Sequence, residues 1–80
     1  MELPEHILNQ APTEDWKFRF YCEYHELRIR LERLRSMLNN WDILDFEPKT
    51  PKSKLIEQGQ AMQQYLSILR ERAELEEIEL

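Results

Sequence analysis

Residues 20–41 read FYCEYHELRIRLERLRSMLNNW, and large apolar side chains recur in this stretch every three or four positions. The recurring residues are Phe20, Tyr24, Leu27, Leu31, Leu34, Leu38 and Trp41. This spacing places them all on one face of an α-helix, as in helices that pack lengthwise against a partner helix. The stretch therefore predicts one long helix, from about residue 14 to residue 39 or 40, with a single apolar seam.

A second stretch repeats the pattern after a linker that contains two prolines. Its seam positions are Leu55, Gly59, Met62, Leu66, Leu69, Ala73 and Glu76. If the two stretches pair antiparallel with Trp41 opposite Leu55, Gly59 lies between Leu38 and Trp41, so that a small residue meets large ones. The predicted fold is therefore all-α, an antiparallel two-helix hairpin spanning 13–80.

The ends of these elements carry their own signals. Residues 1–12 hold two prolines and form a short N-terminal segment, predicted either to make one helical turn over the hairpin or to be disordered. Thr50 followed by Pro51 is the usual N-cap and first-turn pair, and predicts the start of a second helix that continues to about Glu76.

The linker between the helices is unusually apolar for a turn. It contains Ile43, Leu44 and Phe46. These side chains are predicted to fold back onto the open end of the seam.

Composition limits the possible functions. A chain of 80 residues makes one domain with a small core. Its one cysteine, Cys22, cannot form an intrachain disulfide, which favours a reduced compartment, and no stretch resembles a signal peptide or a membrane span. The host cell cytoplasm is the expected location.

Sixteen acidic against 11 basic residues argue against direct binding of nucleic acid.

A second apolar stripe lies opposite the seam on each predicted helix. Its members are Phe18, Cys22, His25 and Ile29 in the first helix, and Ala61, Tyr65, Ile68 and Leu75 in the second. A two-helix hairpin has no third layer to cover them, and exposed stripes of this size usually mark self-association or a partner. We expect a homo-oligomer; the alternative is that the N-terminal segment covers one stripe.

Motifs for catalysis are missing from the sequence. The single glycine, Gly59, lies in mid-helix, so no phosphate-binding glycine loop can form. Ile29 stands where the zinc-protease motif that begins at His25 needs its second histidine, and the pair Cys22 and His25 supplies only two metal ligands. We therefore expect no enzymatic activity, no metal and no cofactor.

Four arginines in residues 28–35 allow two interpretations. They could form an exposed face, paired with neighbouring glutamates. They could instead bind phosphate, since arginine offers several planar donors, with Tyr21, Tyr24 and Tyr65 available to stack on bases.

Five segments resemble small phage-encoded hairpin proteins and the hairpin domain shared by anti-CBASS and anti-Thoeris proteins. The matching residues are Glu23-Tyr24-His25-Glu26-Leu27, Arg30-Leu31-Glu32-Arg33-Leu34, Gln58, Ala61-Met62-Gln63-Gln64-Tyr65-Leu66 and Ile68-Leu69-Arg70-Glu71-Arg72. The resemblance covers roughly residues 17 to 73.

This resemblance implies a non-catalytic protein that sequesters cyclic-nucleotide or cyclic ADP-ribose-type immune signals in pockets between protomers. Tyr24 matches the aromatic residue that the family places near the ligand. Arg28 and Arg70 are then the candidate phosphate ligands by their spacing, and Tyr21 is a further candidate for the site.

Two other functions fit the same sequence. The acidic and apolar surface could make the chain a protein-binding module that inhibits a host protein, with mimicry of nucleic acid as one way to do so. A structural hairpin of a virion is the third interpretation, and no residue distinguishes it.

Overall fold

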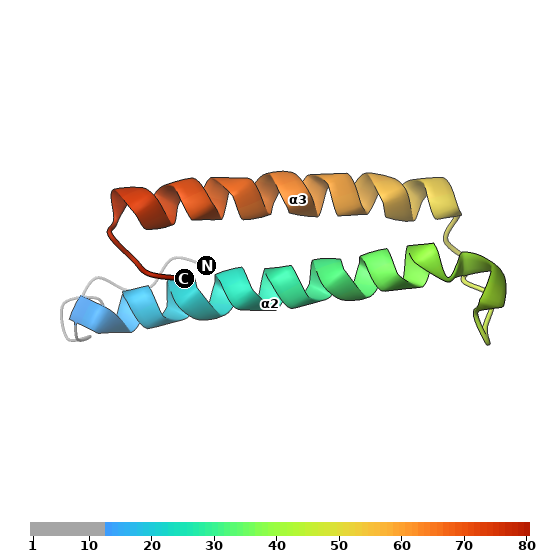
Figure 1. The fold of residues 1–80 in the computed structure, drawn as a ribbon, viewed down its shortest axis with the longest axis horizontal. Coiled ribbons are helices and arrows are strands. Elements are labelled where there is room, and N and C mark those ends of the chain that lie inside the picture. Colours follow the sequence, from blue (N-terminus) through green and yellow to red (C-terminus); the bar gives the residue numbers. More distant parts are fainter. Residues whose placement is uncertain (1–12) are drawn as a thin grey trace.

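The structure, a computed structural model that describes residues 13–80, is a hairpin of two long helices lying side by side (Figure 1). Helix α2 spans Thr13–Asn39 and helix α3 spans Lys52–Leu75, with the short 3-10 helix η1 at Trp41–Ile43 in the connection. The predicted all-α hairpin is confirmed. The predicted N-terminal segment, residues 1–12, lies outside the described residues. Neither described helix is long and apolar enough to cross a membrane.

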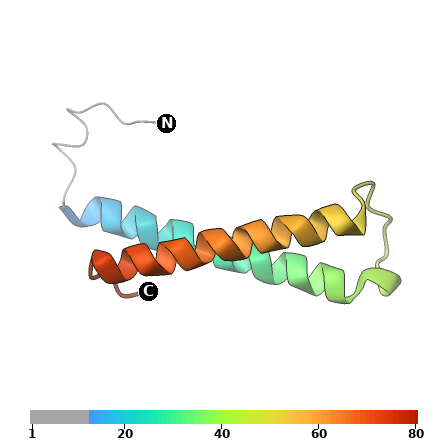
Figure 2. The ribbon, with the colours of Figure 1, turned by 90° about the horizontal axis from the view of Figure 1, so that it is seen from above.

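The core lies along the predicted seam, although the seam positions Leu38, Trp41 and Leu55 are only partly covered and Glu76 is exposed. Its buried side chains are Phe20, Tyr24, Leu31 and Leu34 from α2 and Leu66, Leu69 and Ala73 from α3. Leu31 and Leu69 are almost completely shielded from solvent, and Leu27 and Met62 pack against the cluster while partly exposed. Figure 2 shows the helices crossing obliquely, and their contact depends on the apolar stripe that the heptad spacing supplies.

The register of the two helices differs from the predicted one. A Cβ atom added to Gly59 would lie 3.6 Å from Leu34 Cδ2 and 3.9 Å from Leu31 Cδ1, so Gly59 faces these two residues. The predicted neighbours lie further towards the turn, since Leu38 is about one helical turn beyond Leu34 in α2 and Trp41 is in η1. A slip of one turn keeps the same apolar faces together, so the seam pattern cannot exclude it.

The start of α3 also differs from the prediction. Pro51 is the N-cap, with φ −60° and ψ 144°, and no side chain caps this end. Its carbonyl oxygen accepts hydrogen bonds from the backbone nitrogens of Lys54, at 3.0 Å, and Leu55, at 3.3 Å. The prediction that Thr50 is the cap was wrong, because the extended Pro51 takes the cap position and leaves Thr50 one residue too early.

The apolar linker does not fold back as predicted. Ile43 is 77% exposed and Phe46 is 56% exposed, while Trp41 and Leu44 are only partly covered. The chain leaves α2 through hydrogen bonds from Asn40 to Ser36, and the 3-10 turn that follows directs Ile43 away from the seam.

The carboxyl end of α3 closes in a Schellman turn, and the chain then runs back towards α2 (Figure 1). The backbone nitrogen of Ile78 bonds the Ala73 oxygen at 2.8 Å, and that of Glu77 bonds the Glu74 oxygen at 3.2 Å. Glu77 adopts a left-handed φ of 56°, and Ile78 packs against the core cluster. The tail therefore extends the core by one apolar side chain.

Candidate functional site

Two long edges of the hairpin carry most of its polar contacts between helices. The first, called here the Arg70 flank, consists of Tyr21, His25, Arg28 and Arg35 from α2 and Ile56, Gln60, Gln63 and Arg70 from α3, which follow one another at steps of four, three and seven residues. The opposite edge, the Tyr65 flank, consists of Glu23, Glu26, Arg30 and Tyr65. Helical spacing assigns each of these residues to its edge, and hydrogen bonds between the two helices confirm the assignment.

Tyr24 and Arg70 form the central contact of the Arg70 flank. The Tyr24 ring is 6% exposed and belongs to the core, whereas its hydroxyl accepts a hydrogen bond of 2.8 Å from Arg70 Nε. The Arg70 guanidinium carbon lies 5.8 Å from the centre of the same ring. Because Nε makes the bond, both terminal amino groups of Arg70 extend past the tyrosine. Tyr24 therefore orients an arginine at the surface.

Tyr21, Tyr24 and Arg28 gather around His25. The His25 ring centre lies 4.3 Å from that of Tyr21 and 5.0 Å from that of Tyr24, edge to face with the latter. Arg28 Nε donates to His25 Nδ1 at 3.4 Å. His25 Nε2 is buried and has no hydrogen-bond partner among the described residues. A buried polar atom without a partner costs about 1–3 kcal/mol.

Arg28 has a second contact on the same helix. Its Nη1 atom lies 2.7 Å from Glu32 Oε1, in an ion pair whose side chains are 38% and 61% exposed. Exposed pairs of this type contribute only about 0.3–0.5 kcal/mol. An anion of higher charge could therefore displace Glu32 from Arg28 at little cost.

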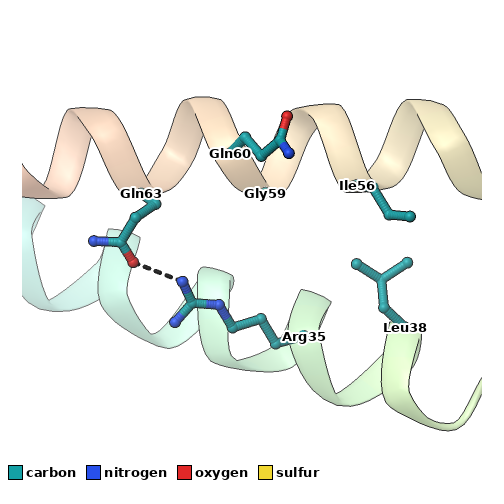
Figure 3. A pocket seen from close by; sticks show the side chains of 6 residues that line it. All are labelled: Arg35, Leu38, Ile56, Gly59, Gln60 and Gln63. Atoms are coloured by element: carbon teal, nitrogen blue, oxygen red, sulfur yellow. Dashed lines mark hydrogen bonds between the residues drawn. The ribbon is translucent and has the colours of Figure 1, made fainter.

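A groove of about 370 Å³ lies further along the Arg70 flank, towards the turn. Its lining residues are Arg35, Leu38, Ile56, Gly59, Gln60 and Gln63. Figure 3 shows Leu38 and Ile56 pointing towards each other at one end, while Arg35 reaches from α2 to Gln63 at the other. An Arg35 terminal amino group donates to Gln63 Oε1 at 2.6 Å.

The Tyr65 flank has a different character. The Tyr65 hydroxyl donates to the Glu23 carboxylate, and this hydrogen bond, followed by burial and the negative charge of Glu23, raises the pKa of Tyr65 above its ordinary value. Glu26 and Arg30 line the shallow depression beside it. Two carboxylates on this edge make it a poorer site for an anion.

The structure brings the predicted site residues together on one flank. Tyr21, Tyr24 and Arg28 contact His25, and Arg70 donates a hydrogen bond to the Tyr24 hydroxyl. Tyr21 is 42% exposed and can offer its ring to a ligand, whereas the buried Tyr24 ring contributes through its hydroxyl.

Two features of the flank escaped the sequence-based prediction. His25 was placed on the outer stripe, although its four-residue and three-residue spacing from Tyr21 and Arg28 was a usable signal. The arginine run also divides, since Arg28 and Arg35 lie on the Arg70 flank and Arg30 on the Tyr65 flank.

Metal ligands do not gather in the described part of the chain. No group of three or more histidine, cysteine or acidic residues is arranged to hold a metal ion within residues 13–80. Cys22 is a partly covered free thiol.

Comparison with known proteins gives one match. A family model described as Sequestin matches residues 14–75, which include both helices. Neither the curated proteins nor the solved structures contain a significant match.

Proposed function

This chain belongs to the Sequestin family, and from that premise we propose that it is a non-catalytic phage counter-defence protein that binds and withholds a cyclic-nucleotide or cyclic ADP-ribose-type immune signal. Family membership suggests a sequestering phage protein. The proposal adds the class of ligand and its place on the molecule. The ligand binds to the Arg70 flank, with Arg28 and Arg70 on its phosphates.

The arrangement of Arg70 is the observation that carries the proposal. The hydrogen bond from its Nε to the Tyr24 hydroxyl fixes the guanidinium before any ligand arrives. Ordering a free arginine side chain on binding costs about 0.5–1.5 kcal/mol, and a fixed one avoids much of that cost. The two terminal amino groups then present parallel donors, which is the geometry that phosphate oxygens accept.

Tyr21 and His25 supply the aromatic part of the site. Stacking of a base on an exposed aromatic ring stabilises a complex by about 1–3 kcal/mol. Tyr21 is held against His25 and leaves 42% of its surface open for that contact.

Self-association completes this proposal. Phe18, Ile29, Ile68 and Leu75 are exposed on the outer faces of the hairpin. A second copy that covered these side chains would also shield ligands bound near the start of α2, because Phe18 and Tyr21 lie within one helical turn. The proposed assembly is a homo-oligomer with ligand sites near the protomer contacts.

Thermal unfolding against a panel of signals tests the proposal. The panel contains cyclic di-AMP, cyclic GMP–AMP, cyclic tri-adenylate and cyclic ADP-ribose. A bound ligand at a concentration 100 times its Kd stabilises a protein by about 2.7 kcal/mol, which a melting curve detects readily. At least one member is expected to raise the melting temperature.

Arginine variants then locate the site. Arg28→Ala and Arg70→Ala should each weaken binding at least tenfold, because each removes a charge-assisted phosphate contact of about 1.5–3 kcal/mol. Arg30→Ala, on the Tyr65 flank, is the matched control and should bind normally. If no panel member binds, the function as a protein-binding module gains support, and the exposed linker residues Ile43 and Phe46 are then its first candidate surface.

A further inference from the structure

The groove beside Gly59 exists because this residue, in the middle of α3, has no side chain. Gly59 faces α2 between Gln63 and Ile56 (Figure 3), and its missing side chain leaves the space open. A Cβ atom here would make ordinary contacts with Leu34 and Leu31, so close approach of the helices does not require glycine. Glycine in a helix interior costs about 1 kcal/mol relative to alanine. Packing gives no reason for that cost, whereas an open groove does.

The two ends of the groove are chemically different. Leu38 and Ile56 form an apolar end, and the Arg35 guanidinium, bonded to Gln63, forms a planar end. Flat aromatic heterocycles stack on arginine guanidinium planes and tolerate aliphatic contacts on their other face. The groove therefore fits a planar ring.

Polar groups on the rim suit a nucleobase rather than a plain aromatic ring. Gln63 Oε1 already accepts from Arg35, which leaves the Gln63 amide nitrogen with two hydrogens to donate. The nearby Gln60 amide offers both a donor and an acceptor. Bases present acceptors and donors along one edge, which amide side chains commonly bind.

The groove also lies on the same edge of the hairpin as the arginine site. Arg35 follows Arg28 by seven residues, and Arg70 follows Gln63 by seven, so each pair is separated by two helical turns, about 10 Å. A molecule of dinucleotide size can reach both places at once.

We propose that the Gly59 groove is a base subsite, which binds one nucleobase of the same ligand whose phosphates contact Arg28 and Arg70. This inference rests on the proposed function and makes it more specific. It requires a ligand with at least one base set apart from the phosphates at the arginine site. Gly59 and Arg35 determine specificity at this subsite.

Nucleosides test the groove without involving the arginine site, since they carry no phosphate. In NMR titrations with adenosine and guanosine at millimolar concentration, the Gly59 amide and the Gln60 and Gln63 side-chain amides should shift. In Gly59→Leu, whose side chain occupies the groove, these shifts of the glutamine amides should vanish. Gln58→Leu places the same side chain one residue away on the other edge of α3, and its spectra should respond as the wild type does.

Calorimetry with whichever cyclic nucleotide of the panel binds provides the second measurement. Gly59→Leu should reduce its affinity at least tenfold and Gln58→Leu should not. If the melting curve shows that Gly59→Leu does not fold, Arg35→Met, which removes the stacking plane and retains an apolar stem, takes its place with the same expected loss.

Two results would overturn the base subsite. One is nucleoside titrations that leave the groove amides unmoved, or that move them equally in Gly59→Leu and the wild type. The other is full affinity for the cyclic nucleotide in a folded groove variant. Either result leaves the arginine site standing, whereas a panel without any bound ligand removes the proposed function and leaves the nucleoside test of the groove in force.

Discussion

Single residues in this hairpin carry costs that the rest of the fold must offset. Gly59 lowers helix stability in the middle of α3, and Glu77 holds a left-handed backbone conformation that residues with a side chain rarely adopt. A substitution at either position should therefore change the free energy of unfolding by a measurable amount.

Glu77→Gly should stabilise the protein by about 1 kcal/mol, because glycine adopts φ values near 56° without steric cost. Removing a negative charge from the carboxyl end of α3 acts in the same direction. Chemical denaturation would measure the change, with Glu79→Gly beyond the Schellman turn as the control. An unchanged or lower stability would show that the αL turn at Glu77 is absent in solution.

Gly59→Ala should also stabilise the protein, by about 1 kcal/mol, since the new Cβ finds ordinary contact distances of 3.6 and 3.9 Å. The reverse change at the next residue, Gln60→Gly, should cost a similar amount. Under the predicted register Gly59 lay against Leu38 and Trp41 and separated large side chains. Destabilisation by Gly59→Ala would therefore favour that register over the observed one.

At the scale of elements, α2 and α3 are held by an apolar seam with hydrogen bonds on both edges. Arg70 to Tyr24 and Arg35 to Gln63 cross one edge, and Tyr65 to Glu23 crosses the other. These contacts join side chains that are distant in sequence, so they fix the register that the seam alone leaves free.

The Tyr24 and Arg70 pair should show energetic coupling in a double-mutant cycle. Tyr24→Phe and Arg70→Leu each remove the hydrogen bond, and the double variant should be more stable than their sum predicts by about 1 kcal/mol. Tyr24→Phe keeps the ring in the core, so it should weaken binding of a cyclic nucleotide severalfold by releasing Arg70. Additive effects on stability would mean that the two side chains do not interact.

Periodicity was sufficient to predict both helices and their seam, because burial of an apolar stripe dominates the stability of long helices. It could not predict the register, since a slip of one turn preserves the stripe. Spacing also made Arg28 and Arg70 candidate phosphate ligands, and the structure places both on the Arg70 flank with Tyr21. The hydrogen bond between Arg70 and the Tyr24 hydroxyl depends on the register, so sequence alone could not predict that Arg70 is the partner of this hydroxyl.

The predictions for the linker and for the start of α3 failed because they rested on preferences that are weaker than helix periodicity. Apolar side chains at Ile43 and Phe46 suggested a covered linker, but a short connection has few conformations that both join the helices and return to the seam. The preference for Thr at the N-cap likewise failed, because Pro51 adopts an extended ψ of 144° and is itself the N-cap.

At the scale of the whole molecule, the hairpin has a thin core and exposed outer faces. Phe18 is 66% exposed and Leu75 is 84% exposed, which leaves two apolar surfaces without a cover in the described part of the chain. Isolated hairpins of this size have little core to stabilise them. Self-association would bury these apolar surfaces and so add to the small core.

Sedimentation of the full chain at micromolar concentration should therefore give at least a dimer. Ile29→Glu or Ile68→Glu should reduce the mass to that of a monomer, because a charge buried at the contact without a partner costs several kcal/mol. Gln58→Glu adds the same charge on the Tyr65 flank and should leave the assembly intact. A monomeric wild-type protein would contradict the assembly, though not the site on the Arg70 flank.

Recovery of an intact ligand is the most direct test of sequestration on the Arg70 flank. The protein is incubated in excess with the panel member that it binds, free ligand is removed by filtration, and the protein is then denatured by heat. We predict that the wild type depletes the signal from the filtrate and releases it chemically unchanged after heating. Arg70→Ala should leave most of it in the filtrate, and Arg30→Ala should deplete it as the wild type does. A cleaved product after heating, or equal depletion by Arg70→Ala and the wild type, would contradict the account.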